Sequence, residues 1–195
     1  MGRAERAHVT TTSQERVAFL DRDGTLIVDR EYLHRIEQVD LLPGAADGLR
    51  ILEGMGFALV ITTNQAGVAR GKFTEDDVRA VNEYLRTILA EQGVHLRGTL
   101  YCPHHPEGEI PEYAILCQCR KPGTGMAKQA ESFLGAIDYA NSWSFGDKPI
   151  DVEFGRNLGV KTALIRSQYW TQPPSPPPDL IVNSLFEAAQ KIRTR

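Results

Sequence analysis

One short stretch near the N-terminus decides the fold of this chain: Val17-Ala18-Phe19-Leu20-Asp21-Arg22-Asp23-Gly24-Thr25. Its first four residues are all apolar, which is typical of a strand that is buried on both faces of a parallel sheet. Two carboxylates and a glycine follow at once and form an acidic turn at the end of this strand. Ligands of open α/β sheets bind outside the carboxyl ends of the strands. We therefore predict a parallel sheet with an acidic site at this point.

Further apolar runs and helical patterns alternate along the rest of the chain. Besides 17–20, we predict strands at 57–62, 98–102, 142–145, 160–165 and 179–182. We predict helices at 45–55, 74–93, 125–135, 150–158 and 185–192. Strands that alternate with helices indicate a parallel sheet that helices cover on both faces. The predicted fold class is therefore α/β, a Rossmann-like three-layer sandwich with a mostly parallel sheet.

The composition excludes several classes of protein. The 195 residues include 22 Lys and Arg against 25 Asp and Glu, a formal net charge of −3. This balance argues against a nucleic-acid binder, and no apolar run approaches the roughly 20 residues that cross a bilayer. Residues 1–14 lack the apolar core of a signal peptide, so we predict a disordered tail. We expect one cytoplasmic domain at 15–195, with a stiff Pro-rich connector at 173–178.

Four polar segments follow predicted strands or lie in the loops after them. They are Asp21–Thr25, Thr62–Gly67, Arg120–Gly123 and Phe145–Asp151. The first offers paired carboxylates for nucleophilic and proton-transfer chemistry, and the second offers donors for phosphate oxygens. The third supplies two cations, and Asp147 in the fourth could complete a Mg²⁺ site. Each segment alone also fits an ordinary solvated turn, surface loop or helix cap.

Together and in this order, the four segments resemble the motifs of the haloacid dehalogenase (HAD) superfamily of phosphohydrolases. Asp21–Thr25 matches the first motif, Thr63 the second, Lys121 the third, and Asp147 with Asp151 the fourth. The resemblance covers the chain from Val17 to Trp170. It implies a Mg²⁺-dependent phosphatase, an activity that depends on positioning and charge neutralisation.

The same resemblance implies roles for individual residues. Asp21 is the nucleophile that forms an aspartyl-phosphate, and Asp23 protonates the leaving alkoxide and then deprotonates the attacking water. Mg²⁺ is held by the Asp21 carboxylate, the Asp23 backbone carbonyl and Asp147. Thr63 and Lys121 bind the transferring phosphoryl oxygens, and Asn64 and Gln65 are expected to assist them.

All three cysteines of the chain lie between Cys102 and Cys119. An odd number without signs of secretion makes a disulfide framework a poor explanation. Cys102 and His104, together with Cys117 and Cys119, could close a tetrahedral structural Zn²⁺ site. His105 could replace His104, and free thiols beside a chance histidine pair would give the same pattern. We predict that zinc folds the segment 102–119, the zinc loop, and thereby fixes Arg120 and Lys121.

The spacing of residues in this loop restricts the resemblance to fewer families within the superfamily. Its pattern Cys-x-His-x₁₂-Cys-x-Cys before Arg-Lys-Pro is similar to the family of D-glycero-D-manno-heptose-1,7-bisphosphate 7-phosphatases, which serve the synthesis of heptose nucleotide precursors. The related histidinol-phosphate phosphatases have a shorter zinc loop and remain an alternative. A non-catalytic, zinc-stabilised phosphosugar-binding module is the alternative from another class. The heptose resemblance implies that the substrate is contacted by Asp29, Arg30, Glu31, Tyr32, Arg120 and Lys148.

The spacing of the motifs leaves no room for a cap domain. Only about 18 residues separate Thr25 from Pro43, and the zinc loop fills the other insertion point of the superfamily. We therefore expect a cap-less, monomeric phosphatase with a comparatively open site. Its partner would be a small phosphorylated sugar, with Mg²⁺ as catalytic and Zn²⁺ as structural cofactor.

Overall fold

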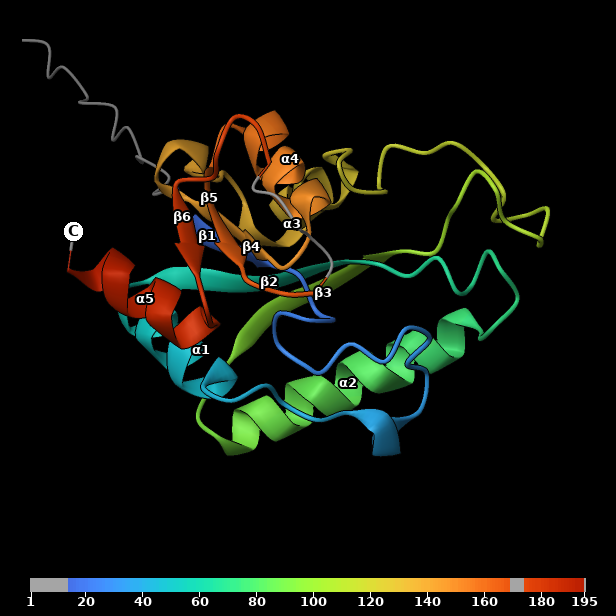
Figure 1. Ribbon diagram of the computed structural model, residues 1–195, viewed down its shortest axis with the longest axis horizontal. Helices are drawn as coiled ribbons and strands as arrows, with labels where there is room; N and C mark the ends of the chain where they lie inside the picture. Colours follow the sequence, from blue (N-terminus) through green and yellow to red (C-terminus); the bar gives the residue numbers. More distant parts are fainter. Residues whose placement is uncertain (1–13, 169–173, 195) are drawn as a thin grey trace, which may run out of the picture.

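The computed structural model describes residues 14–168 and 174–194 and has a parallel sheet between two layers of helices (Figure 1). The strands are β1 (Arg16–Leu20), β2 (Phe57–Asn64), β3 (Leu96–Cys102), β4 (Trp143–Gly146), β5 (Lys161–Ile165) and β6 (Leu180–Val182). The helices are α1 (Ala45–Gly54), α2 (Glu75–Glu91), α3 (Gly125–Leu134), α4 (Pro149–Leu158) and α5 (Leu185–Arg193). Short 3-10 helices lie at Ile36–Gln38 and Tyr139–Asn141.

The strand order β3-β2-β1-β4-β5-β6 puts β1 in the middle of the sheet. The chain runs outward from β1 to one side and then returns to β4 on the other side. Leu20 at the end of β1 is paired with Ile61 of β2 and with Phe145 of β4. The direction of winding therefore reverses between β1 and β4, and such a switch point is where open α/β sheets bind their ligands.

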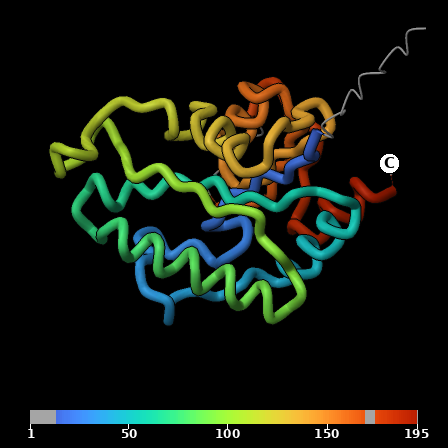
Figure 2. The backbone as a smooth tube through the Cα atoms, turned by 180° about the vertical axis from the view of Figure 1, so that it is seen from behind, coloured from blue at the N-terminus to red at the C-terminus, as the bar shows by residue number. Residues whose placement is uncertain are grey.

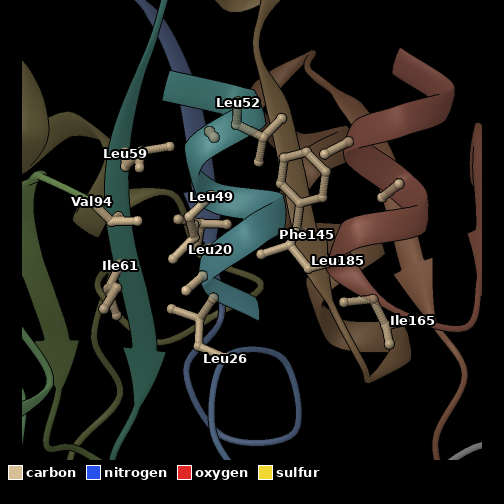
Figure 3. Close-up of a cluster of buried hydrophobic side chains, with 14 of the residues drawn as sticks. Leu20, Leu26, Leu49, Leu52, Leu59, Ile61, Val94, Phe145, Ile165 and Leu185 are labelled. Atoms are coloured by element: carbon tan, nitrogen blue, oxygen red, sulfur yellow. The ribbon is translucent and has the colours of Figure 1, made fainter. Parts of the chain in front are cut away.

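Helices cover both faces of the sheet, as the alternating pattern predicted. One apolar cluster joins the sheet to α1, α2 and α5, and a second joins it to α3 and α4. Figure 3 shows the first cluster, in which Leu49 and Leu52 of α1 and Leu185 of α5 approach Phe145 of the sheet. These side chains are at most 2 % exposed, so the ends of the central strands rest on a rigid base.

The predicted helices and strands are confirmed, with shifts of a few residues at their ends. The cap of α2 is the one expected from Thr74 and Asp77, since each side chain accepts a hydrogen bond from the other residue's backbone N–H. The segment after the Pro-rich connector belongs to the sheet, because β6 pairs with β5 and α5 packs on α1. Residues 1–13 of the predicted tail and residue 173 of the connector lie outside the described residues.

Neither predicted insertion point holds an extra folded unit in the described part of the chain. The link from β1 to α1 contains only the short 3-10 helix at Ile36–Gln38 and isolated bridges. The link from β3 to α3 has no helix or strand and extends beside the start of α2, as Figures 1 and 2 show from opposite sides. The domain is therefore cap-less, and none of its described helices is long and apolar enough to cross a membrane.

Candidate active site and metal centre

Asp21 and Asp147 follow two neighbouring strands and lie together at the switch point. The backbone N–H of Asp21, directly after β1, donates to the carbonyl of Phe145 in β4 at 2.9 Å. Gly24 has a φ of +83°, and a Cβ atom there would lie 2.4 Å from a carboxylate oxygen of Asp147. Only glycine meets both conditions, so the turn after β1 can close against Asp147.

A buried lysine connects two carboxylates at the base of the site. The Nζ atom of Lys121 lies 2.7 Å from Oδ1 of Asp21 and 2.5 Å from Oδ1 of Asp151. Although burial opposes the charged form, Asp151 and Asp21 raise the pKa of Lys121. Burial also raises the pKa of Asp21, and the Lys121 charge opposes this rise. The lysine therefore stays protonated and can neutralise negative charge at this point.

Asp147 supplies the clearest sign of a cation-binding site. It is fully buried, and neither carboxylate oxygen has a hydrogen-bond partner among the described residues. Burial and the nearby charge of Asp21 raise the pKa of Asp147 to about 7. Oxygen atoms of Asp21, Asp147 and Asp151 lie within 4.8 Å of one another. Buried carboxylates without partners are costly unless a cation joins them, and an all-oxygen donor set suits Mg²⁺.

The acidic turn and the end of β2 are joined by a single amide. The Nε2 atom of Gln65 donates to Oδ2 of Asp23 at 2.9 Å and to Oγ1 of Thr63 at 2.8 Å. Asn64, which is predicted to assist phosphate binding, also contacts the backbone of Lys121. Its amide accepts from the Lys121 backbone N–H at 2.9 Å and donates to the Lys121 carbonyl at 3.2 Å. Asn64, the last residue of β2, therefore holds the backbone of Lys121 in place.

These groups open into a cleft of about 320 Å³, here called the sheet-edge cleft. Of the predicted residues, the cleft is lined by Asp21, Asp23, Asp29, Glu31, Tyr32, Thr63, Asn64, Gln65, Arg120, Lys121 and Lys148. Asp147 is fully buried and does not line it. Arg30 does not line the cleft, because its guanidinium pairs with the carboxylate of Asp40 on the surface. The prediction that Arg30 contacts the sugar therefore has no support from its position.

The wall formed by residues 29–32 is shaped by a local turn. Oδ1 of Asp29 accepts the backbone N–H of Glu31 at 2.9 Å, and Glu31 has a φ of +57°. Oδ2 of Asp29 meets Nζ of Lys148 at 2.9 Å across the cleft. Burial opposes the charge of Lys148, but nearby carboxylates, first that of Asp147, hold the pKa of this lysine above its usual value.

The cysteines gather with one of the two candidate histidines. The Sγ atom of Cys119 lies 3.0 Å from that of Cys102 and 3.3 Å from that of Cys117, and Nδ1 of His104 lies 3.3 Å from it. Tetrahedral zinc with metal–sulfur distances of about 2.3 Å would set its ligand atoms roughly 3.7 Å apart. Small outward shifts would therefore admit the ion. His105 lies outside this cluster, and its ring faces Arg70.

The zinc loop is also attached to the cleft and to α2. The Nη1 atom of Arg120 donates to the carbonyl of His104 at 3.3 Å. The hydroxyl of Tyr113 donates to the Glu75 carboxylate of α2 at 3.0 Å. A change in the metal cluster would therefore reach Arg120, which lines the sheet-edge cleft.

Four residues of the site were given no role in the prediction, although Arg22 and Ile150 lie inside predicted motifs. Phe73 and Ile150 line the cleft, while Arg22 and Asn82 form a buried pair that does not line it. Asn82 left a signal in the sequence, because it is a polar residue one turn after Val78 on the apolar side of α2. Phe73 left none, because single apolar residues beside loops are common, and Ile150 was marked only by its place inside the fourth motif.

Comparisons with known proteins agree with this geometry. A family model described as HAD-hydrolase-like matches residues 118–188. The D-glycero-beta-D-manno-heptose-1,7-bisphosphate 7-phosphatase of Yersinia pestis is 41% identical over 91% of this chain and 95% of its own length. Its counterpart in Escherichia coli (strain K12) is 42% identical over 90% of this chain and 92% of its own length.

A solved structure shows the same fold. The D,D-heptose 1,7-bisphosphate phosphatase of B. bronchiseptica, complexed with magnesium and phosphate, superposes with a TM-score of 0.79. It is 24% identical, and the match covers 92% of this chain and 98% of the other. At this identity the likeness concerns the fold alone.

Proposed function

Because this chain belongs to the HAD-like family of D-glycero-beta-D-manno-heptose-1,7-bisphosphate 7-phosphatases, we propose that it hydrolyses the 7-phosphate of D-glycero-D-manno-heptose 1,7-bisphosphate. The observation that carries the proposal is the pairing of Asp21 with a protonated Lys121, together with the unpartnered Asp147, which offers a carboxylate oxygen within 4.8 Å of one of Asp21. This arrangement offers a carboxylate nucleophile, a cation for phosphoryl oxygens and a place for a metal ion within one small volume.

The donor set supports Mg²⁺ as the catalytic cofactor. The Asp21 carboxylate, the Asp23 backbone carbonyl and the Asp147 carboxylate would hold the ion, with Asp151 one helical turn further on. When bound, Mg²⁺ neutralises the charge of the phosphoryl oxygens and lowers the barrier to attack by an anionic nucleophile.

We propose one nucleophilic attack by Asp21 and two proton transfers by Asp23. A carboxylate oxygen of Asp21 forms a bond to phosphorus while the bond to the sugar oxygen breaks, and Asp23 gives its proton to that oxygen. The Asp23 carboxylate then takes a proton from a water molecule whose oxygen attacks the aspartyl-phosphate. Inorganic phosphate leaves, and Asp21 returns to a free carboxylate.

The rest of the bisphosphate would lie along the open cleft. Arg120 has no carboxylate within 4 Å among the described residues, so its charge is available to an anionic ligand. Lys148 is partly neutralised by Asp29. Both cations line the cleft, as do Glu31 and Tyr32, which could contact the sugar hydroxyls. Thr63 would assist Lys121 at the transferring phosphoryl group.

Zinc would have a structural task in this proposal. The four ligands leave no coordination position open for a substrate, so the ion would fold the zinc loop. Arg120 and Lys121 directly follow the last ligand, Cys119. We further propose that the chain works as a monomer in the cytoplasm. Sedimentation of the purified protein would test the oligomeric state.

The deciding experiment compares kcat/KM for heptose 1,7-bisphosphate and for histidinol phosphate with the same Mg²⁺-loaded enzyme. We expect the heptose substrate to be preferred by at least about 100-fold, since specific cleft contacts distinguish substrates on this scale. A preference for histidinol phosphate would overturn the proposed substrate. Binding of either phosphoester without Mg²⁺-dependent release of phosphate would instead indicate a non-catalytic binding module.

A further inference from the structure

Arg22 stands between Asp21 and Asp23 in the sequence, and its side chain is almost completely buried. Its side chain is 1 % exposed and is the largest among the fully buried side chains of the described residues. Removing a cation from water is costly unless the protein provides a partner of opposite charge. Within the described chain, the carboxylate that meets Arg22 within 4 Å is that of Asp23.

The contact between the two residues involves both carboxylate oxygens. Nε of Arg22 donates to Oδ2 of Asp23 at 3.0 Å, and Nη2 donates to Oδ1 at 3.3 Å. Gln65 adds its hydrogen bond to the same Oδ2 atom at 2.9 Å. Paired donors of this kind fix the orientation of a carboxylate as well as its position.

Arg22 is itself held from the far side. Its Nη1 atom donates to Oδ1 of Asn82 at 2.9 Å, and Asn82 is 4 % exposed on the face of α2 that packs against the sheet. Arg22 and Asn82 do not line the sheet-edge cleft. The side-chain contacts that connect this pair to the cleft are those between Arg22 and Asp23.

We propose that Arg22, anchored by Asn82, is a positioning residue that sets the orientation of the Asp23 carboxyl group for proton transfer to the leaving oxygen. This inference rests on the acid–base role of Asp23 in the proposed function. The link runs from α2 through a buried guanidinium to the acidic turn, so the helix and the sheet jointly determine where the proton is delivered.

A positioning role has a signature that a purely structural role lacks. The proton from Asp23 matters when the leaving oxygen is strongly basic, and it matters little when the leaving group is stable as an anion. The loss of correct positioning should therefore slow the hydrolysis of phenyl phosphate much more than that of 4-nitrophenyl phosphate. These two esters have similar shapes, so a general distortion of the cleft would affect both alike.

The test measures kcat/KM for both aryl phosphates with Mg²⁺ present. We expect Arg22→Met to lower the value for phenyl phosphate about 10- to 100-fold and that for 4-nitrophenyl phosphate less than about threefold, because general acids contribute about 10²–10⁴-fold. Asn82→Leu should give the same pattern more weakly, and Arg22→Lys should restore part of the loss. Arg86→Met, an exposed arginine of α2 paired with Glu83, should change neither value.

Equal losses on the two esters, or no loss on either, would overturn the inference. Asn82→Leu keeps the test valid if Arg22→Met fails to fold, which a melting temperature would reveal. Asp23→Ala separates this inference from the proposed function. If Asp23→Ala shows no leaving-group effect, the acid role of Asp23 fails; if it does and Arg22→Met does not, only the positioning role fails.

Discussion

The sheet-edge cleft and the zinc loop meet at Arg120, yet different interactions hold them in place. The cleft residues stand on the ends of parallel strands, whose positions depend on two apolar clusters beneath them. After Cys102, the last residue of β3, the zinc loop has no helix or strand, and Ile115 and Leu116 in it are 43% and 88% exposed. A segment that buries so little apolar surface needs another source of stability. The comparison indicates that the part of the site on the strands depends on the apolar core, whereas the part on the loop would depend on the proposed zinc ion.

Asp21→Asn should abolish turnover in the sheet-edge cleft and leave the zinc loop intact, and it should have the largest effect on activity. The variant keeps the shape of the side chain but removes the nucleophile, so we expect kcat to fall by more than about 10³-fold. Zinc content and melting temperature should stay close to those of the wild type. Asp76→Asn, at an exposed carboxylate paired with Arg79 on α2, is the matched control. Appreciable residual turnover would contradict the assignment of Asp21.

Cys117→Ser tests whether a metal ion stabilises the zinc loop. Loss of one ligand should release zinc, lower the melting temperature and reduce kcat/KM about 10- to 100-fold, the range seen when the surroundings of a metal site are disturbed. Atomic absorption, thermal unfolding and steady-state kinetics measure the three effects. Leu116→Ala, next in the chain and 88% exposed, should change none of them. Full activity in a zinc-free variant would show that the loop folds without the ion.

The pH dependence of stability in the Mg²⁺-free protein distinguishes the sheet-edge cleft from the zinc loop. The carboxyl group of Asp147 has an ordinary pKa of 3.8, and burial with the charge of Asp21 raises this pKa to about 7 in the folded chain. Between these values the folded chain keeps the proton and the unfolded chain has lost it. Stability should therefore fall as pH rises from about 4 to about 7, and then level off.

Denaturant unfolding of the Mg²⁺-free protein at a series of pH values measures how the free energy of unfolding changes with pH. Asp147→Asn should flatten this dependence, because the substituted side chain has no proton to lose. Added Mg²⁺ should stabilise the protein more at pH 8 than at pH 5, since the ion competes with the Asp147 proton. An unchanged slope in Asp147→Asn would show that another group is responsible.

Tyr113→Phe should have the smallest effect. It removes the hydrogen bond from the zinc loop to Glu75 of α2 but keeps the aromatic ring. We expect a fall in melting temperature of no more than about 2 °C, with zinc content and kcat unchanged, because the metal cluster holds the loop independently. Loss of zinc from this variant would mean that the attachment to α2 and the metal site depend on each other.

Much of the cleft could be predicted because its residues lie in short motifs after recognisable strands. Asp21, Thr63 and Asp147 follow apolar runs whose ends meet at one edge in any parallel sheet. Asn64 shows the limit of such reasoning. It lies beside Thr63 in the same motif, but its amide holds the backbone of Lys121, a contact between residues far apart in the sequence.

The two candidate zinc histidines show a similar limit. His104 and His105 are adjacent, and their spacing to the cysteines left both possible. The backbone N–H of His105 donates to the carbonyl of Tyr113 at 3.1 Å, and its ring lies near Arg70. These contacts leave His104 to face the three sulfur atoms. The difference depends on how the loop folds back on itself, which no local pattern encodes.

The sequence by itself determined the fold class, the acidic turn and the candidate zinc ligands, because apolar periodicity and ligand spacing are local properties of the chain. The tertiary structure decided which charges meet. It brought Lys121 to Asp21 and Lys148 to Asp29, directed Arg30 away from the cleft, and buried Arg22 against Asn82. The physical reason is that an ion pair between distant residues depends on strand order and helix packing, which the apolar core sets only when the whole chain has folded.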